Sequence, residues 1–419
     1  MKALRFLAFA GLLVFLWAFG FFWRDIQQGQ LPSPRALAMA FGSEGQANLT
    51  PEQVFKTTYN RIASSYYRPV KTLDLKYAGM EGLMASLGDP HTMFLPPKLA
   101  ESFALETRAN FVGIGARLSP DELGAKIAVV FDDGPAATAG LGTDDIITTI
   151  DGVSFAGKGV DLLVSQIRGK EGTWVRLGVL KKGETKITTY RVRRAKIITP
   201  TVEGTYLKDS QIGYVMIASF SEPTAEQFDT VMDKLSKEPL KGVVIDLRTN
   251  PGGLLETAVE MVSRFVEDKV VVTMKDREGR RSSAVSLRGM KREWPYPVVV
   301  LIDEDSASAA EIFAGVLRDY RKATLVGTHS YGKASVQEVK ELIDGASAKI
   351  TIAKYFLPSA EDISRKVDID GQYVSGGLQP DIVSKIDESK QTSYSDFGDP
   401  KNDSQLRRAI EVILGTPPR

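Results

Sequence analysis

The hydrophobic pattern in the region 48–104 is helical. Apolar residues recur at helix-like intervals from residue 51 onward, where Thr50 can cap the helix and Pro51 suits its first turn. A second helical pattern runs from 73 to 87 and stops at the sequence GDP, because proline cannot continue the hydrogen-bond ladder. The region 48–104 is therefore predicted to be helical.

The pattern then changes to short strand-like runs separated by turn signals. The clearest runs cover 126–130, 146–150 and 175–180, and two of them end at the turn sequences DG and KKG. The region 105–196 is therefore predicted to be a small β-rich module.

Beyond this module, apolar strands alternate with helical stretches. This alternation is typical of an α/β core, which we place at 197–419. The predicted strands are 214–217, 243–247, 298–302 and 324–326, and the predicted helices are 224–236, 255–266 and 309–320.

The chain begins with a continuous apolar run at 6–23, long enough to just span a bilayer. Lys2 and Arg5 precede the run and favour a cytoplasmic N-terminus, which places the bulk of the chain outside the cytoplasm. The run ends in FFW rather than in small residues, which favours an uncleaved anchor at 1–24 over a removable signal peptide. A polar linker at 25–47 follows. We expect a periplasmic or cell-envelope protein, anchored to the inner membrane or secreted after cleavage.

The composition removes several classes of function. The formal charge of +1 over 419 residues gives no reason to expect a nucleic acid partner. The chain has no cysteine, so disulfides and thiolate chemistry are excluded. Its two histidines, His91 and His329, argue against a zinc site built on several imidazoles, and we expect neither a metal nor another cofactor.

Ser308 lies where a predicted strand turns sharply into a predicted helix. A serine there is close to unpaired helix N–H groups and to the positive end of the helix dipole, which suits a nucleophile in acyl transfer. The spacing Ser308 to Glu311 also fits an ordinary capping box, which is the more frequent role of such a serine. Residue type and spacing do not distinguish Ser308 from Ser306.

A second motif, YGKASVQ at 331–337, directly follows the strand-like run 324–326. Together with SASAAE at 306–311, it resembles the carboxyl-terminal processing, or tail-specific, serine proteases. The resemblance extends to SLGDPH at 86–91, DLRTNPGG at 246–253, TIAKYFLP at 351–358 and GLQPD at 377–381. It implies a protease core of the crotonase/ClpP-like type in an α/β multidomain chain. The catalytic residues it implies are Ser308 as nucleophile, Lys333 as general base and Gln337 in support.

The β-rich module resembles a PDZ domain. The resemblance rests on FVGI at 111–114, GPAATAGL at 134–141 and DIITTIDG at 145–152. PDZ domains bind a free C-terminal carboxylate at a glycine-containing loop and add the peptide as a strand. Here phenylalanine replaces the first glycine of that loop. The peptide-binding residues it implies are Val112, Gly113, Ile114 and Arg168.

A lysine base requires a specific environment. An ordinary lysine has a pKa of about 10.4, so an apolar pocket must lower the pKa of Lys333 for it to act near neutral pH. Attack by Ser308 also creates an oxyanion that needs preorganised donors. We expect these to be the backbone N–H of Ala309 and that of Gly252 or Gly253.

Three other interpretations remain open. The spacing of Gly327, Gly332 and Lys333 nearly matches a phosphate-binding loop of an NTPase, although Ala334 replaces its metal-binding Ser or Thr. A non-catalytic PDZ adaptor and a Ser-His triad are the other two. The favoured interpretation is an endopeptidase that recognises protein substrates with apolar C-termini and cleaves through an acyl-enzyme. It contacts the membrane through 6–23, and a regulatory or adaptor partner and a homo-oligomer are left open.

Overall fold

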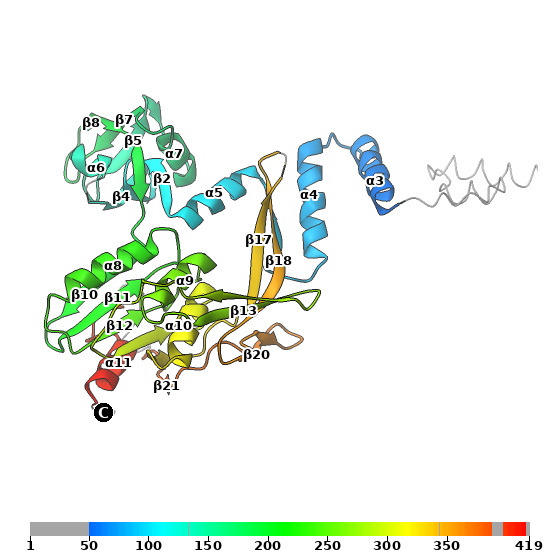
Figure 1. Cartoon of the computed structure of the whole chain (residues 1–419). Helices are drawn as coiled ribbons and strands as arrows, with labels where there is room; N and C mark the ends of the chain where they lie inside the picture. Colours follow the sequence, from blue (N-terminus) through cyan, green and yellow to red (C-terminus); the bar gives the residue numbers. More distant parts are fainter. Residues whose placement is uncertain (1–49, 133, 343, 388–396, 416–419) are drawn as a thin grey trace, which may run out of the picture. The chain divides into compact units, whose positions relative to one another are not determined.

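The structure is a computed structural model, and it describes residues 50–132, 134–342, 344–387 and 397–415 (Figure 1). The expected anchor at 6–23 and the linker at 25–47 lie outside these residues. Within the described ranges, no helix combines the length and the apolar character needed to cross a bilayer.

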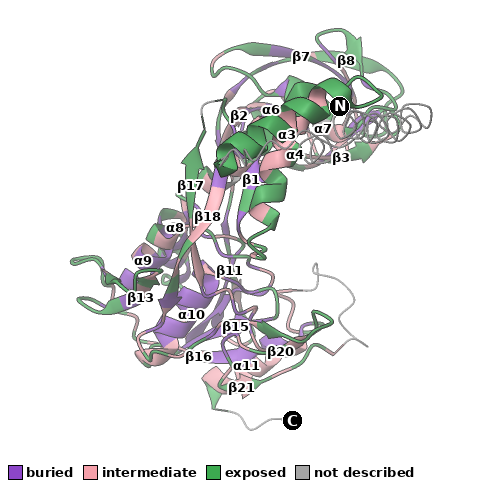
Figure 2. Cartoon of the chain, turned by 90° about the vertical axis from the view of Figure 1, so that its right-hand side faces the viewer, coloured by how far each residue is buried: buried purple, intermediate pink, exposed green. Residues whose placement is uncertain are grey.

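Contacts divide the chain after Ala78 into two units. The first unit contains α3 (Pro51–Ser65) and the beginning of α4 (Thr72–Ala85). Thr50 caps α3 as predicted: its side chain accepts the N–H of Gln53, and the Gln53 side chain accepts the N–H of Thr50. Neither helix contains a buried residue, and α3 is almost entirely exposed in Figure 2.

The β-rich module is a sheet with strand order β3-β4-β5-β7-β8, in which β6 pairs with β5. Alternate strand positions such as Ile127, Ile147 and Leu177 fill its core together with Leu163 of α7. A separate antiparallel pair, β2 with β9, brings the two ends of the module together. The elements are β2 (Asn110–Gly113), β3 (Ala116–Asp121), β4 (Gly124–Val130), α6 (Pro135–Thr138), β5 (Ile146–Ile150), β6 (Val153–Ser154), α7 (Val160–Ile167), β7 (Trp174–Leu180), β8 (Ile187–Arg193) and β9 (Ala195–Ile198).

The α/β core is built on a sheet with strand order β10-β11-β12-β15-β16-β21. All neighbouring strands are parallel except β10 and β11. The elements are β10 (Val202–Leu207), β11 (Ile212–Ile217), α8 (Thr224–Leu235), β12 (Gly242–Asp246), α9 (Leu255–Ser263), β15 (Val298–Ile302), α10 (Ala309–Asp319), β16 (Thr324–Gly327), β21 (Ile382–Val383) and α11 (Ser404–Leu414).

Both faces of this sheet are buried. Val243 and Ile245 of β12 pack into the cluster that contains α8, α9 and α10, whereas Val244 between them packs into the cluster that contains α11. Strands covered on both sides need apolar residues at every position, which explains the continuous apolar runs in the sequence. Figure 2 shows the buried residues concentrated in α10 and β15.

A second sheet was not predicted from the sequence. Its strand order is β1-β18-β13-β14, with β17 paired to β18. Many of its positions are exposed on one side or both, so its sequence lacks the strong apolar runs of the core. The elements are β1 (Met93–Leu95), α5 (Pro97–Arg108), β13 (Val270–Asp276), β14 (Arg281–Val285), β17 (Ser335–Glu341) and β18 (Ser347–Phe356), with a small separate hairpin of β19 (Lys366–Val367) and β20 (Tyr373–Ser375).

Candidate active site

Ser308 occupies a strained turn immediately before α10. Its backbone has φ of 56° and ψ of −116°, a conformation that non-glycine residues rarely adopt. Two contacts hold the backbone there: the N–H of Ser308 donates to Glu311 Oε2 at 2.8 Å, and the hydroxyl of Tyr355 lies 3.4 Å from the Ser308 carbonyl oxygen. The side chain is partly exposed. The sharp turn predicted at this position is therefore present, and it presents Ser308 rather than burying it.

The structure distinguishes Ser308 from Ser306. Ser306 is fully buried, and its hydroxyl donates to the Leu247 carbonyl at 2.7 Å and contacts Asp303. Its backbone N–H also donates to Asp303. Ser306 is thus a structural residue of the turn, and Ser308 is the serine of this motif that a substrate can reach.

Lys333 lies in the loop between β16 and β17, and its side chain is partly buried. Burial lowers the pKa of its ammonium, and the positive charge of Lys349 lowers it further. The carboxylates of Glu311 and Asp89 act in the opposite direction. The direction of the shift agrees with the requirement for an unprotonated amine. No hydrogen bond joins Lys333 Nζ to Ser308 Oγ within the described residues.

One buried carboxylate, that of Glu311, links the turn at Ser308 to the loop that contains Lys333. Glu311 has no exposed surface, and its Oε2 accepts the N–H of Ser308 at 2.8 Å and the N–H of Lys333 at 2.9 Å. Its Oε1 accepts the hydroxyl of Ser330 and the N–H of Gly332. Burial raises the pKa of this carboxyl, while the four donors favour its ionised form. Glu311 therefore fixes the serine turn against the lysine loop.

Replacing Glu311 by glutamine is expected to loosen this junction. The new amide group must face two of the four donors, so buried N–H groups lose their acceptor at a cost of about 1–3 kcal/mol each. We expect the free energy of unfolding to fall by about 1–3 kcal/mol for each donor left without an acceptor, and kcat to fall at least about tenfold. Peptidase assays and chemical denaturation measure both effects.

The matched control for this change is Glu304→Gln, which removes the same charge from an exposed position in the same turn. It should leave both kcat and stability near the starting values. An equal effect of the two substitutions would show that Glu311 acts only through overall charge.

The loop after β12 approaches the serine turn closely. A Cβ at Gly252 would lie 2.5 Å from the Ala307 carbonyl oxygen and 2.8 Å from the backbone nitrogen of Ala309, so only glycine fits. The N–H of Gly252 donates to Asn250 Oδ1 at 2.8 Å. In the described contacts, the N–H of Gly253 has no such acceptor. Of the two glycines considered, Gly252 is thus the one shown to approach Ala309, and Gly253 is the one whose N–H has no acceptor among the described contacts.

Gln337 has partners other than the lysine amine. Its Nε2 donates to Ser335 Oγ at 2.8 Å and to Thr351 Oγ1 at 3.2 Å. Both contacts of this amide nitrogen lie within the β17 and β18 pair, and neither is to Lys333 Nζ. Its position supports the strand that follows Lys333.

A buried ionic cluster stabilises the start of the loop at 247–253, which follows β12 and is called the glycine loop below. Arg248 is fully buried, and it pairs with Asp246 and with Asp403 at 2.5 and 2.6 Å. Its guanidinium also donates to Gln405 at 2.9 Å and lies 3.8 Å from the ring centre of Phe397. Asp403 and Gln405 belong to the start of α11, so the C-terminal helix holds the strand end from which the glycine loop departs.

Comparison with known proteins identifies this arrangement. The model of Peptidase family S41 matches residues 211–384, and that of the PDZ domain matches 112–192. A probable CtpA-like serine protease of Staphylococcus aureus (strain bovine RF122 / ET3-1) is 34% identical over 353 residues, which cover 84% of this chain and 67% of that protein. This chain belongs to peptidase family S41. It is a serine-type peptidase of the carboxy-terminal processing group that carries a PDZ domain.

Two further proteins are similar over most of the chain. The carboxy-terminal processing protease CtpB of Bacillus subtilis (strain 168) is 31% identical over 388 residues, covering 91% of this chain and 76% of that protein. Among solved structures, the photosystem II D1 C-terminal processing protease is 26% identical and covers 79% of this chain and 86% of that one, with a TM-score of 0.45.

The PDZ domain of this S41 peptidase has a free strand edge. Among the described strands, β3 pairs only with β4, and α7 packs beside it. Val112 and Gly113 lie in β2, but the Ile114 side chain is buried in the domain core, so only its backbone can meet a peptide. Arg168 follows α7, and its guanidinium lies 5.4 Å from the ring centre of Phe111.

The structure argues against the NTPase interpretation. A phosphate-binding loop leads into a helix, whereas Lys333 leads into the strand β17. His329 stacks on Tyr373 with ring centres 4.0 Å apart, and its Nδ1 lies 3.0 Å from the Ser330 carbonyl oxygen. His91 makes an edge contact with Tyr331. Neither histidine hydrogen-bonds Ser308 in the described part of the chain.

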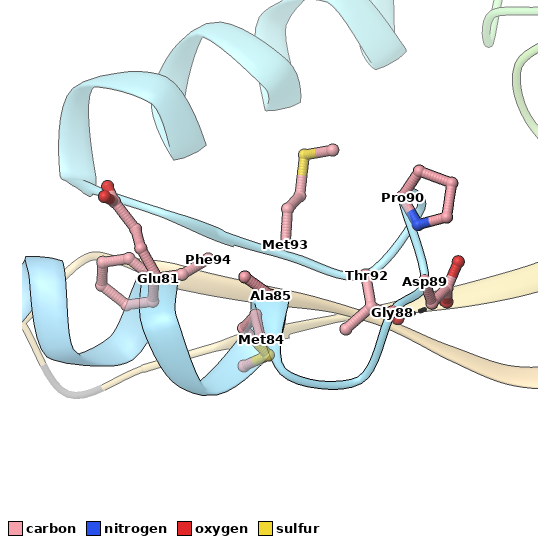
Figure 3. Close-up of a pocket in the computed structure, with 9 residues that line it drawn as sticks. All are labelled: Glu81, Met84, Ala85, Gly88, Asp89, Pro90, Thr92, Met93 and Phe94. Atoms are coloured by element: carbon pink, nitrogen blue, oxygen red, sulfur yellow. Dashed lines mark hydrogen bonds between the residues drawn. The ribbon is translucent and has the colours of Figure 1, made fainter. Parts of the chain in front are cut away.

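A separate pocket of about 500 Å³ lies beside the motif SLGDPH at 86–91 (Figure 3). Asp89 at its rim accepts a hydrogen bond from the Thr92 hydroxyl at 2.7 Å. None of the candidate catalytic or peptide-binding residues lines it. Its lining residues are Glu81, Met84, Ala85, Gly88, Asp89, Pro90, Thr92, Met93 and Phe94.

Proposed function

We propose that this S41 peptidase hydrolyses internal peptide bonds of protein substrates with a Ser308/Lys333 dyad and through an acyl-enzyme. The observation that carries the proposal is the shared Glu311 oxygen, which accepts the backbone N–H groups of both dyad residues. The depressed pKa of Lys333 and the strained, partly exposed turn of Ser308 support the same assignment. A core of the crotonase/ClpP-like type remains part of this proposal.

In the first half of the reaction, the Ser308 hydroxyl oxygen attacks the scissile carbonyl carbon while the neutral amine of Lys333 takes the hydroxyl proton. The carbonyl oxygen becomes negative and is stabilised by the N–H groups of Ala309 and Gly253. When the C–N bond breaks, the Lys333 ammonium gives its proton to the leaving amine. The product is an ester on Ser308 and a neutral Lys333.

In the second half, Lys333 takes a proton from water, and the resulting hydroxide oxygen attacks the ester carbonyl. The same two N–H groups stabilise the second oxyanion. Collapse breaks the ester bond while the Lys333 ammonium returns its proton to the Ser308 oxygen, and the new C-terminal carboxyl group loses its own proton to solvent. Gln337 supports the strand after Lys333 and takes no part in proton transfer.

Substrate selection is assigned to the PDZ domain. A peptide C-terminus adds along the free edge of β3, and its carboxylate meets the backbone N–H groups near Gly113 and Ile114. Val112 and Arg168 flank this loop. Because the carboxylate provides the strongest contacts in this mode of binding, an apolar tail with a free C-terminus is the preferred substrate.

A peptide with a free apolar C-terminus is expected to be cleaved with a KM at least about tenfold lower than that of its amidated form, since the amide loses the charge-assisted hydrogen bonds. Steady-state kinetics on the two peptides test this. A third peptide, with the same cleavage region but a tail ending in aspartate, controls for the apolar contribution. Equal kinetics for the free and amidated peptides would remove the PDZ step from the proposal.

A further inference from the structure

The peptide group that joins Gly332 to Lys333 is held at both of its polar ends. Its N–H donates to Glu311 Oε2 at 2.9 Å, and its carbonyl oxygen accepts the backbone N–H of Arg365 at 2.8 Å. The preceding peptide group donates its N–H to Glu311 Oε1 at 2.6 Å. Its carbonyl oxygen, that of Tyr331, accepts Arg365 Nη1 at 3.4 Å. Because the N–H and C=O of a trans peptide point in opposite directions, Glu311 and Arg365 hold this backbone from opposite sides.

The segment that carries Arg365 packs directly on the lysine loop, which is the stretch 328–334 between β16 and β17. A Cβ at Gly332 would lie 2.7 Å from the Ile363 carbonyl oxygen and 2.8 Å from the backbone nitrogen of Arg365. Gly332 also has a φ of 91°, which glycine adopts without strain. The Ile363 carbonyl oxygen accepts the N–H of Gly377 at 2.9 Å. The segment 363–365 therefore contacts the lysine loop closely and is itself anchored at Gly377.

Two tyrosine rings hold the Arg365 side chain in place. Its Cζ lies 4.8 Å from the ring centre of Tyr331 and 5.2 Å from that of Tyr373. Tyr373 is fixed in turn by His329, which stacks on it with ring centres 4.0 Å apart, and by its hydroxyl, which donates to the Gly376 carbonyl oxygen at 2.8 Å. A planar guanidinium stacks on aromatic faces and still directs N–H groups at an acceptor, whereas an ammonium is a compact point charge.

We propose that Arg365 is a positioning residue that fixes the carbonyl side of the lysine loop and thereby holds Lys333 in the orientation that proton transfer requires. The proposal rests on the function proposed above. Glu311 holds the N–H side of the same two peptide groups, so the backbone that leads to the base has one support on each side. Displacement of a catalytic group by about 1 Å can cost about a hundredfold in rate, so loss of one support should be visible in the chemistry.

The test is steady-state peptide cleavage by the full chain carrying Arg365→Met or Arg365→Lys. Both variants keep the backbone N–H at this position and lose the planar guanidinium. Because Lys333 acts in both halves of the reaction, we expect kcat to fall about ten- to hundredfold in each variant, while KM changes less than about threefold. Full activity of Arg365→Lys would show that positive charge alone is sufficient and would overturn the proposal.

The matched control is Lys366→Met, which removes a positive charge from the next residue, whose side chain is exposed. It should leave kcat and KM unchanged, and a loss equal to that of Arg365→Met would contradict the proposal. Circular dichroism gives the folded fraction of each variant. A fall in kcat no larger than the fall in folded fraction would assign Arg365 a purely structural role and overturn the proposal.

Tyr373 offers a second route to the same support, which remains available if Arg365→Met folds poorly. Tyr373→Leu removes one ring from the guanidinium and is expected to lower kcat about three- to thirtyfold, whereas Tyr373→Phe keeps the ring and should retain kcat to within about threefold. Since both residues act through one guanidinium, Arg365→Met combined with Tyr373→Leu should be about as slow as Arg365→Met alone. Losses that multiply, or an unchanged kcat in Tyr373→Leu, would overturn the proposal.

Failure of this inference can be distinguished from failure of the proposed function. If Lys333→Arg remains active, Lys333 is not the base and the function proposed above fails with this inference. If Lys333→Arg is inactive while Arg365→Met keeps its kcat, only the role of Arg365 is wrong.

Discussion

Ser308→Ala and Lys333→Arg are each expected to lower kcat/KM for peptide cleavage by about 10⁴-fold or more, since loss of a nucleophile or its base removes the covalent route. Alanine and serine are equally strained at a φ of 56°, so the first change should not unfold the turn. Arginine preserves the positive charge but cannot deprotonate near neutral pH. The second change therefore separates proton transfer from simple electrostatic attraction. Steady-state peptidase assays measure both.

The control for these two variants is His329→Ala. A dyad requires no histidine, so this enzyme should keep its activity to within about tenfold, with the loss limited to the stacking contact with Tyr373. Activity that survives in Ser308→Ala would leave a peptide-binding adaptor, or a different nucleophile, as the better account. Inactive His329→Ala combined with active Lys333→Arg would instead favour a Ser-His mechanism.

Arg248→Met is expected to lower the free energy of unfolding by about 3–5 kcal/mol, because it leaves the carboxylates of Asp246 and Asp403 buried without a cation. Adding Asp403→Asn should recover part of this loss by removing one of the two unpaired charges. Activity should fall further than the population of folded protein, since Arg248 directly precedes the glycine loop. Chemical denaturation measures the stability of each variant.

Arg288→Met is the matched control for this prediction. Arg288 pairs with Asp268, but both side chains are largely exposed, so the substitution should leave the free energy of unfolding nearly unchanged. Equal costs for Arg248→Met and Arg288→Met would contradict the importance assigned to the buried cluster.

The core strands were predictable because their buried environment requires continuous apolar runs, which are visible in the sequence. Strand 298–302 is predicted and observed with the same bounds, and helix 309–320 is confirmed as α10 to within one residue. Burial on two faces requires uninterrupted apolar residues. The second sheet has no such apolar runs. Its strand β17 is largely polar and exposed, and it forms a strand through its pairing with β18.

The sequence indicates the candidate residues of the site but not the contacts that join them. Motif order indicates Ser308 and Lys333, whereas only the burial of the Ser306 hydroxyl excludes the neighbouring serine. The spacing of Ser308 and Glu311 was visible as a capping box. Nothing local in the sequence indicates that Glu311 also accepts hydrogen bonds from the segment 330–333, because that contact depends on how two separate loops pack. The pairing of Arg248 with Asp403 is hidden for the same reason.

The most direct test of the account is labelling by a fluorophosphonate probe, which forms a covalent bond with an activated serine oxygen and is located by peptide mass spectrometry. The account predicts a single adduct on Ser308, formed at a rate that rises as Lys333 loses its proton and that falls at least about a hundredfold in Lys333→Arg. An adduct on another serine, or a labelling rate at Ser308 that is the same in Lys333→Arg, would contradict it.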